Sequence, residues 1–205
     1  MSAGEVVRVV VATANVGKVE EIRQALDIPG WEFLTAAELG GEPIEVEETG
    51  QTFTENALLK AHAYADRFRC AALSDDSGLE VDALAGAPGV RSSRFSGEEA
   101  TDAENNMKLL LMLAAVPEDE RTARFRSVVV LIEPDGAVTV VDGSCEGRIG
   151  AAPRGSGGFG YDPLFLPDAA PGRTMAELTL AEKNAISHRG VALAALHDAL
   201  VFREA

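Results

Sequence analysis

The sequence predicts an α/β fold built around a mixed β-sheet, and three observations support that prediction. Apolar, β-branched runs alternate with segments of helical periodicity through the first half of the chain. In the second half, two strand-like runs are separated only by the turn signal at residues 134–136, Pro-Asp-Gly, which indicates an antiparallel hairpin. The chain has 205 residues, of which 46% are hydrophobic, enough for one substantial core. The sequence contains no internal repeat and no linker, so we expect residues 1–205 to form a single domain.

The first part of the chain predicts a strand, a helix, a strand and a helix, in that order. Residues 6–12 form a nearly continuous β-branched run, typical of a strand that is buried on both faces. Residues 17–26 follow with helical spacing, and residues 31–34 form a short strand candidate. A capping-box pattern at residues 52–55 then begins a helix. The apolar face expected on this helix consists of Phe53, Ala57, Leu58, Ala61, Ala65 and Phe68.

Two adjacent carboxylates follow this helix, in the stretch ALSDDSGL at residues 72–79. Residues 70–73 are apolar and predict a short buried strand. We therefore expect residues 74–78 to form a loop at the carboxyl end of that strand. Ligands bind at this edge in open α/β sheets, so the loop is a candidate functional site.

The second half of the chain predicts helices on both sides of the hairpin. Residues 101–104 form another capping-box pattern. The helix that begins there is expected to carry an apolar stripe of Met107, Leu110, Leu111 and Ala114. The hairpin strands are expected at residues 124–133 and 137–141, and a further helical stretch begins at residues 179–182. Ser187 can cap a last helix. The apolar residues of that helix are Val191, Leu193, Ala194, Leu196, Leu200 and Val201.

Composition and charge exclude several classes of function. With 18 basic and 33 acidic residues the formal net charge is −15, which disfavours binding to a nucleic acid polymer because phosphate contacts need a basic face. The longest apolar runs are far shorter than the roughly 20 residues of a membrane helix, and the N-terminal residues lack the pattern of a signal peptide. Only two cysteines, Cys70 and Cys145, are present, as expected in a reducing compartment. We therefore expect a cytoplasmic protein that does not bind membranes.

The glycine-rich loop at residues 150–160 ends in a formal match to the dinucleotide fingerprint GxGxxG, at residues 155–160. That fingerprint requires a helix directly after it, whereas residues 161–165, Tyr-Asp-Pro-Leu-Phe, contain a proline that blocks a helix. A plain glycine turn is one alternative. We favour a loop whose aromatic and acidic side chains stack on a flat base and accept its N–H groups.

Two other segments could bind an anion. The turn at residues 13–18 lies between the first strand and the first helix, where backbone N–H groups and the helix dipole favour phosphate. It lacks the P-loop pattern, so a purely structural turn is the alternative. His188 and Arg189 lie in the first turn of the last helix, close after Lys183. Because cations at that position oppose the helix dipole, an anionic or carbonyl-bearing partner explains them better than helix stability does.

Two acidic pairs lie on the two sides of the helix expected after residue 52. Glu47 and Glu48 precede it, and Asp75 and Asp76 follow it. Either pair alone is explained by a charged surface loop. Together the pairs offer the hard oxygen ligands that Mg²⁺ prefers.

Six motifs, in this order, resemble those of the inosine triphosphate pyrophosphatase family, the dITP/XTP pyrophosphatases, over essentially the whole chain. They are TANVGK (13–18), EETGQTFTENALLKA (47–61), SDDSGLEVDAL (74–84), APGVRSSRFSG (87–97), GGFGYDPLF (157–165) and AEKNAISHRG (181–190). The resemblance implies a Mg²⁺-dependent enzyme that splits ITP, dITP or XTP into the monophosphate and pyrophosphate. It also implies an elongated mixed sheet with helices, two lobes around a central active-site cleft, and a homodimer.

The resemblance also implies roles for individual residues. Asp76 would be the proton acceptor for the attacking water, Lys60 a phosphate partner, and Glu47 and Asp76 the metal ligands, with Glu48 as the alternative to Glu47. Ser77 would contact the substrate. The residues expected to bind the triphosphate are Thr13, Ala14, Asn15, Val16, Gly17 and Lys18. The residues expected to hold the base are Phe159, Gly160, Tyr161 and Asp162, and those expected to read the purine edge are Lys183, His188 and Arg189.

The sequence departs from the family pattern at two positions. Ala14 stands where glycine is frequent, and Cys145 stands where an aromatic residue is frequent, which puts local packing or a dimer contact in doubt. Two other functions compete with hydrolysis of purine nucleotides. They are a nucleotide-binding sensor that does not hydrolyse its ligand and a pyrophosphatase for modified pyrimidine nucleotides.

Overall fold

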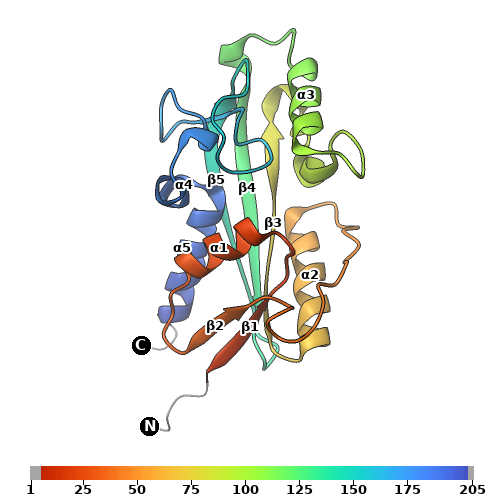
Figure 1. Ribbon diagram of the computed structural model, residues 1–205, viewed down its shortest axis with the longest axis vertical. Helices are drawn as coiled ribbons and strands as arrows, with labels where there is room; N and C mark the ends of the chain where they lie inside the picture. The colour runs from red at the N-terminus through yellow and green to blue at the C-terminus, as the bar shows by residue number, and fades with distance from the viewer. Residues whose placement is uncertain (1–5, 203–205) are drawn as a thin grey trace. The chain divides into compact units, whose positions relative to one another are not determined.

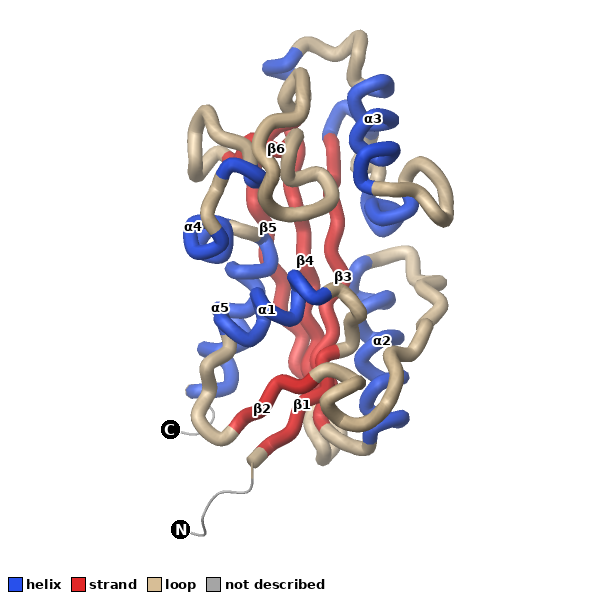
Figure 2. The backbone as a smooth tube through the Cα atoms, in the orientation of Figure 1, coloured by secondary structure: helices blue, strands red, loops and turns tan. Residues whose placement is uncertain are grey.

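A computed structural model of the chain describes residues 6–202, apart from the side chain of Val16 (Figure 1). Six strands form one sheet in the order β2-β1-β3-β4-β5-β6. The strands are β1 (Val7–Val11), β2 (Trp31–Leu34), β3 (Ala71–Val81), β4 (Thr122–Ile132), β5 (Val138–Ile149) and β6 (Phe165–Pro167). The helices are α1 (Val16–Ala25), α2 (Phe53–Phe68), α3 (Asp102–Met112), α4 (Leu180–Ile186) and α5 (His188–Val201), and Figure 2 shows how loops connect these elements.

The sheet is mixed, as the sequence predicted. Strand β1 pairs in parallel with both β2 and β3, and β5 pairs antiparallel with β6. Strands β4 and β5 are neighbours joined by the tight turn at residues 133–137, in which the Gly136 N–H donates to the Glu133 carbonyl. A connection this short joins only antiparallel strands, so the predicted hairpin is confirmed. Strand β5 continues to Ile149, well beyond its predicted end at residue 141.

The chain forms two compact units. The first unit contains the residues up to Asp76, residues 128–142 and the chain from Arg189 onward, and the second contains residues 77–127 and 143–188. The main core of the first unit includes Val9, Val11, Ile22, Leu26, Phe33, Leu73, Val129, Leu131, Leu193 and Leu196. The core of the second unit includes Leu79, Val81, Leu109, Leu113, Phe125, Cys145, Ile149, Leu164, Phe165 and Met175. Each unit therefore has a hydrophobic core of its own.

The two sequence departures have simple structural settings. Cys145 is buried in the core of the second unit, where burial raises the pKa of its thiol to about 11. Among the described residues other than glycine, only Arg69 and Ala85 have positive φ angles. Ala14 therefore adopts a backbone conformation that is open to any L residue, and glycine is not required there.

The loop predicted at residues 74–78 is wrong, because these residues continue β3 as a regular strand from Ala71 to Val81. Adjacent charged and small residues are a turn signal in the sequence. Here Ser74, Asp75 and Asp76 are all buried and find polar partners from helices, so the strand continues through them. Long-range pairing has overridden the local turn propensity.

The apolar stripe predicted on α3 is also wrong. Met107 is 65% exposed and Leu111 is 70% exposed. The helix instead buries Leu109 together with Asn105 and Asn106. Apolar residues occur on more than one side of this helix, so their periodicity alone does not identify the buried side.

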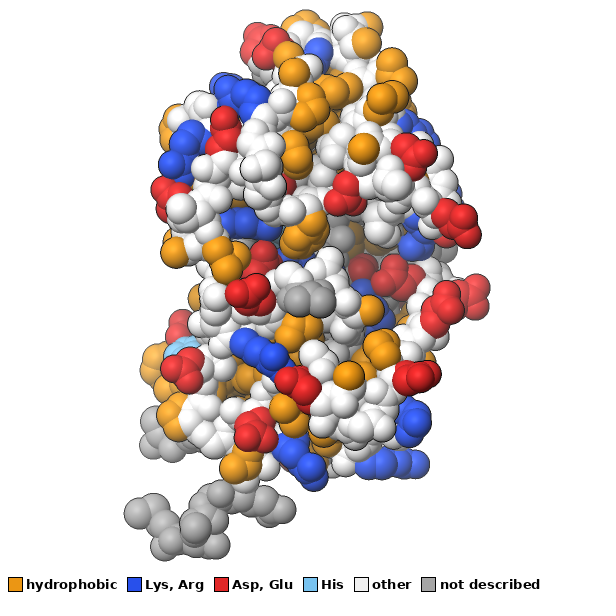
Figure 3. Space-filling view, viewed as in Figure 1, with side chains coloured by type: hydrophobic (Ala, Val, Ile, Leu, Met, Phe, Trp, Pro, Cys, Tyr) orange, Lys and Arg blue, Asp and Glu red, His pale blue; other side chains and the backbone are white. Residues whose placement is uncertain are grey.

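The surface carries mixed charge. Figure 3 shows acidic and basic side chains interspersed over the visible face, with no continuous basic area on it. No helix in the described part of the chain has both the length and the hydrophobicity needed to cross a membrane.

Candidate active site

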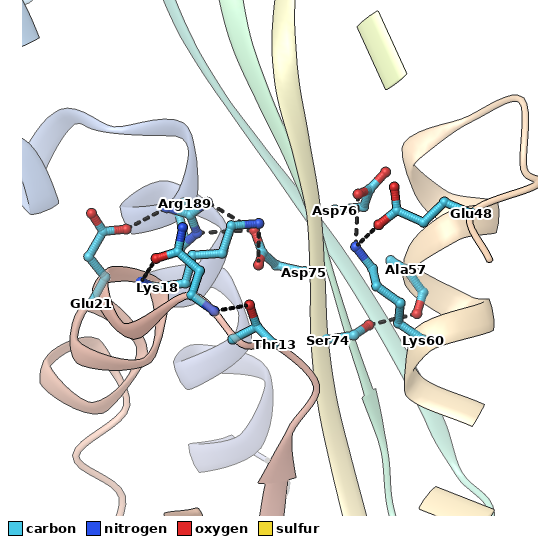
Figure 4. Close-up of polar contacts among 11 residues, drawn as sticks. Thr13, Lys18, Glu21, Glu48, Ala57, Lys60, Ser74, Asp75, Asp76 and Arg189 are labelled. Carbon is cyan, nitrogen blue, oxygen red and sulfur yellow. Dashed lines mark hydrogen bonds and ion pairs between the residues drawn. The ribbon is translucent and has the colours of Figure 1, made fainter. Parts of the chain in front are cut away.

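The two adjacent carboxylates of β3 lie on opposite faces of the sheet in the first unit. Ala71 and Leu73 belong to the core that also contains α1 and α5, whereas Ala72 belongs to a cluster that contains α2. Because side chains alternate along a strand, Asp75 points toward α1 and α5, and Asp76 points toward α2 (Figure 4). Both residues are buried. The acidic pair of the sequence is therefore divided between two separate polar clusters.

Asp76 is bound from two directions by side chains of α2. The Lys60 ammonium lies 2.9 Å from Asp76 Oδ1, and the Asn56 amide donates to Asp76 Oδ2 at 3.3 Å. Asn56 and Lys60 are four residues apart, so they lie on one face of the helix. Lys60 also contacts Glu48 Oε1 at 2.9 Å. One lysine thus holds two carboxylates from different parts of the chain.

The charge balance of this cluster favours an additional cation. Burial raises the pKa of Asp76 and, together with the nearby Glu48 carboxylate, outweighs the opposing effect of Lys60. Burial alone would lower the pKa of Lys60, but the neighbouring carboxylates, Asp76 foremost, raise it above its usual value. Two acidic side chains share one ammonium, so the cluster holds a net negative charge when both are ionised. A divalent cation would relieve that excess.

The donor atoms of this cluster fit Mg²⁺. Carboxylate oxygens are the hard ligands that Mg²⁺ prefers, and it commonly uses one or two of them, with water and substrate phosphate completing the octahedron. Within residues 6–202, no group of three or more His, Cys, Asp or Glu side chains is placed to hold a metal ion. Glu48 reaches the cluster, whereas Glu47 is exposed. The geometry therefore favours Glu48 over Glu47 beside Asp76, and Glu47 as a ligand stays a prediction.

Asp75 is part of a buried cluster on the other face of β3 (Figure 4). Lys18 Nζ lies 3.0 Å from Asp75 Oδ1, and Arg189 Nε and Nη2 both lie 3.0 Å from Asp75 Oδ2. The opposite end of the Arg189 guanidinium contacts Glu21. The side chains of Asp75, Arg189 and Glu21 are 1%, 1% and 5% exposed. Arg189 therefore neutralises two buried carboxylates at once.

The same cluster fixes the charge of Asp75. Burial alone would raise the pKa of Asp75, but Arg189 first and Lys18 second outweigh it and hold the pKa far below its usual range. The pKa of Lys18 is lowered, because burial and the nearby Arg189 charge outweigh the attraction of Asp75. Asp75 is consequently ionised at neutral pH and holds Lys18 and Arg189.

The predicted phosphate turn is pinned by its own side chains. Asn15 caps α1 by accepting a hydrogen bond from the Lys18 N–H at 3.2 Å, and the Asn15 N–H donates to Thr13 Oγ1 at 3.1 Å. Ala14 and Asn15 are exposed. The first backbone N–H groups of a helix and the positive end of its dipole favour an anion. The turn thus offers an exposed helix start with Lys18 beside it. Among the residues predicted here, the side chain of Val16 lies outside the described structure.

In the second unit, Asp162 organises the glycine-rich loop. Asp162 Oδ2 accepts hydrogen bonds from the Phe159 N–H and from Lys183 Nζ, both at 2.9 Å. Lys183 Nζ also lies 4.5 Å from the centre of the Phe159 ring. Gly158 has a φ of +72°, and a Cβ at that position would lie 2.0 Å from Asp162 Oδ2. The loop therefore needs glycine at residue 158 to bring Phe159, Asp162 and Lys183 together.

Helix α3 holds the same loop from the other side. The Gly160 N–H donates to Asp102 Oδ2 at 2.7 Å, and Asn106 Nδ2 donates to the Gly160 carbonyl at 2.8 Å. A cavity of about 700 Å³ lies between helix and loop. It is lined by Asp102, Ala103, Asn106, Met107, Leu110, Leu111, Pro153, Ser156, Gly157, Gly158, Phe159, Gly160 and Pro163.

Three further predicted residues occupy buried or half-buried positions in the second unit. Tyr161 is 3% exposed and donates from its hydroxyl to the Ser92 carbonyl at 2.8 Å, and burial raises its pKa. The His188 ring stacks on Phe125 with centroids 4.9 Å apart. Ser77, the next residue of β3 after Asp76, is half-buried. Their roles as substrate contacts stay predictions.

The predicted residues thus form two groups, each within one unit. The group in the first unit is Thr13, Ala14, Asn15, Val16, Gly17, Lys18, Glu47, Glu48, Lys60, Asp76 and Arg189. The group in the second unit is Ser77, Phe159, Gly160, Tyr161, Asp162, Lys183 and His188. The resemblance groups Arg189 with Lys183 and His188, and the structure assigns Arg189 to the first unit and the other two residues to the second. The role of Arg189 at the purine edge stays a prediction.

Two residues of these clusters were not identified from the sequence. Asn56 is fully buried and contacts Asp76. The sequence signal that could have identified Asn56 is that a polar residue stands at an inward position of an amphipathic helix, one turn before Lys60. Glu21 contacts Arg189, and its signals were an adjacent acidic residue, Glu20, and its position three residues after Lys18. Glu20 is exposed, and an acidic pair on a helix is typical of a solvated face, so the pattern does not distinguish Glu21.

Comparison with known proteins gives one consistent result. The model of the Ham1 family matches residues 9–199. The dITP/XTP pyrophosphatase of Escherichia coli K12 is 50% identical over 195 residues, covering 94% of this chain and 98% of that protein. The dITP/XTP pyrophosphatase of Geobacter sulfurreducens is 53% identical over 193 residues, covering 94% of this chain and 96% of that protein.

Solved structures agree in fold. A HAM1 protein from Coxiella burnetii matches with a TM-score of 0.85 and 43% identity, covering 95% of this chain and 98% of that one. A nucleoside-triphosphatase, dITP/XTP pyrophosphatase, from Mycobacterium abscessus matches with a TM-score of 0.74 and 44% identity, covering 92% and 98% of the two chains. The similarity therefore extends over nearly the full length of both structures.

Proposed function

This chain belongs to the Ham1 family, and from that premise we propose that it hydrolyses the non-canonical purine nucleoside triphosphates ITP, dITP and XTP. The products are the nucleoside monophosphate and pyrophosphate. The observation that carries this proposal is the pair of carboxylates, Glu48 and Asp76, gathered on Lys60 in the first unit. The relatives named dITP/XTP pyrophosphatase, at about half identity over nearly the whole chain, support the substrate class.

Asp76 and Glu48 would hold Mg²⁺, the cofactor. When bound, the metal neutralises phosphate charge and makes a coordinated water more acidic. Asp76 accepts a proton from the attacking water. The water oxygen bonds to phosphorus, the anhydride bond between the α and β phosphates breaks, and pyrophosphate leaves with the bonding electrons. Lys60, whose ammonium lies 2.9 Å from both carboxylates, would stabilise the developing phosphate charge.

The triphosphate would bind to the turn at residues 13–18. The capped start of α1 supplies backbone N–H groups, and Lys18 supplies a positive charge whose position is fixed by Asp75. Asp75 thus acts through Lys18 and does not itself need to contact the substrate. Arg189 contacts Asp75 and Glu21, so it would act indirectly too, by holding Asp75 in the position that fixes Lys18.

The base would bind to the glycine-rich loop of the second unit. Phe159 provides a ring on which a purine can stack, and Lys183 and His188 are the proposed donors to its 6-keto group. A 6-amino group would face these donors without an acceptor, and such a mismatch rejects adenine strongly. The organised contacts among Phe159, Asp162 and Lys183 support this assignment.

We further propose that the whole chain, 1–205, acts as one catalytic domain, that the enzyme is a homodimer and that it is cytoplasmic. The presence of the family match across residues 9–199 supports the first point. The two cysteines are free thiols, which supports a reducing compartment.

A substrate panel tests the proposed function. Purified protein is incubated with Mg²⁺ and ITP, XTP, dUTP, GTP or ATP, and released pyrophosphate and inorganic phosphate are measured separately. We expect pyrophosphate from ITP and XTP, much less from GTP and ATP, and none after chelation of the metal. A non-hydrolytic sensor would bind ITP and release nothing, and preferential turnover of dUTP would indicate a pyrimidine enzyme instead.

A further inference from the structure

We infer that Asn56 is a positioning residue that orients the Asp76 carboxylate and connects it to the acidic loop at residues 47–50. The inference rests on the proposed function, because it takes Asp76 as the proton acceptor and metal ligand. Asn56 itself needs no contact with the substrate. Its contribution comes through the two side-chain atoms of its amide, each of which has a different partner.

The two oxygens of Asp76 are bound by two residues of one helix. Lys60 Nζ contacts Oδ1 at 2.9 Å, and Asn56 Nδ2 donates to Oδ2 at 3.3 Å. Hydrogen bonds to both oxygens fix the plane of a carboxylate as well as its position. Asn56 is neutral, so it orients Asp76 and leaves the negative charge available for a cation. Asn56 is also 0% exposed, so water does not compete for its amide.

The other end of the Asn56 amide binds the acidic loop. Asn56 Oδ1 accepts the Gly50 N–H at 2.8 Å. A Cβ at Gly50 would lie 2.5 Å from Asn56 Oδ1 and 2.7 Å from Glu55 Cβ, so only glycine lets the loop approach this closely. Glu48 lies two residues earlier in the same loop and reaches Lys60. The contact therefore holds Glu48 near Asp76.

The chemistry of the partners determines which way the amide points. The N–H of Gly50 needs an acceptor and the carboxylate of Asp76 needs a donor. Rotating the Asn56 amide by 180° would place two donors together on one side and two acceptors together on the other. Asparagine satisfies both partners in one orientation only, whereas aspartate, which has no donor when ionised, satisfies only Gly50.

Helix α3 provides a matched control within the chain. Both helices begin with the pattern Thr-x-x-Glu-Asn, at residues 52–56 and 101–105, and both have a capping box. Asn105 is buried, its Oδ1 accepts the Ser96 N–H at 2.7 Å, and its Nδ2 donates to the Ser93 carbonyl at 2.9 Å. Asn105 therefore anchors a loop as Asn56 does, but without a carboxylate partner.

The test compares Asn56→Ala with Asn105→Ala. The three measurements are kcat and KM for ITP, binding of Mn²⁺ alone by electron paramagnetic resonance, and the thermal unfolding midpoint. Loss of a residue that orients a metal ligand typically costs 10–100-fold in metal affinity or activity. For Asn56→Ala we expect a fall of at least tenfold in kcat, weaker Mn²⁺ binding and a KM within about threefold of wild type. For Asn105→Ala we expect a comparable loss of stability, with kcat and Mn²⁺ affinity within about twofold of wild type.

Asn56→Asp is the second variant, because it is nearly isosteric and retains the acceptor for Gly50. It places a carboxylate against Asp76 Oδ2, so kcat is again expected to fall at least tenfold. The inference is overturned if either Asn56 variant keeps wild-type kcat, or if Asn105→Ala loses as much kcat and Mn²⁺ affinity as Asn56→Ala. A wild-type protein that releases no pyrophosphate contradicts the proposed function, and the Mn²⁺ comparison still tests Asn56. A wild-type protein that binds no Mn²⁺ overturns the inference as well.

Discussion

Replacing Arg189 with methionine should destabilise the protein far more than a typical surface substitution. The guanidinium is 1% exposed and lies between Asp75 and Glu21, whose side chains are 1% and 5% exposed. Its removal takes the guanidinium away from two buried carboxylates, while Lys18 remains 3.0 Å from Asp75. Breaking a buried ion pair by removing one partner costs about 3–5 kcal/mol. For a chain of this size that corresponds to a drop of at least about 6 °C in the unfolding midpoint.

The control is Arg124→Met in the second unit. Arg124 also contacts more than one carboxylate, Asp82 at 2.9 Å and Glu146 at 3.0 Å. Those carboxylates are 45% and 53% exposed, and such surface pairs contribute about 1 kcal/mol or less. Urea unfolding of both variants measures the difference. Equal effects of the two substitutions, or a loss below about 1 kcal/mol for Arg189→Met, would refute the reasoning from burial.

The pH dependence of unfolding provides a second check on Arg189. In the wild type the pKa of Asp75 is lowered in the folded state, so its contribution to stability is present above the pKa of the unfolded chain and is lost as the pH falls. Arg189 is the largest of the charges that lower the pKa of Asp75, so Arg189→Met lacks most of this contribution. The difference in stability between variant and wild type should therefore shrink on acidification. A difference that stays constant between neutral pH and the acid range would contradict this account.

Three further predictions concern the proposed chemistry. Asp76→Asn should abolish release of pyrophosphate from ITP while circular dichroism shows a retained fold, and near-normal turnover would exclude Asp76 as the proton acceptor. Glu48→Gln should raise the Mg²⁺ concentration needed for half-maximal activity at least tenfold, because Glu48 and Asp76 contact the same lysine, Lys60. Glu47→Gln should change that concentration little, because Glu47 is exposed. Gly158→Ala should weaken ITP binding, measured as KM, more than it lowers kcat, since its Cβ would lie 2.0 Å from Asp162; an unchanged KM would remove the loop from base recognition.

Local signals in the sequence predicted the helix starts and the hairpin correctly. The capping boxes at Thr52 and Thr101 are complete in the structure, with each threonine and its glutamate bonded reciprocally. The turn at residues 134–136 joins two antiparallel strands, as its composition indicated. These features depend on contacts within a few residues, which a pattern in the sequence can specify.

The clusters around β3 depend on contacts that no local pattern specifies. Asp75 pairs with Arg189, which lies 114 positions away in the sequence. Because this partner neutralises the buried carboxylate, a segment with the composition of a turn can form part of a buried strand. The family resemblance identified Arg189 as important but grouped it with Lys183 and His188. The choice between Glu47 and Glu48 was likewise open, because in a loop only the three-dimensional path shows which carboxylate reaches Lys60.

The alternation of Asp75 and Asp76 across β3 also limits how this segment can change in evolution. Neighbouring positions of a strand exchange faces when its register moves by one residue. A one-residue insertion or deletion between Ala71 and Asp75 would turn Asp76 toward α1 and Asp75 toward α2, reversing the environments that hold one carboxyl strongly ionised and raise the pKa of the other. Substitutions in this stretch can be compensated by neighbouring side chains, but a change of length cannot. The number of residues between the start of β3 and its acidic pair is therefore as important for the proposed active site as the acidic residues themselves.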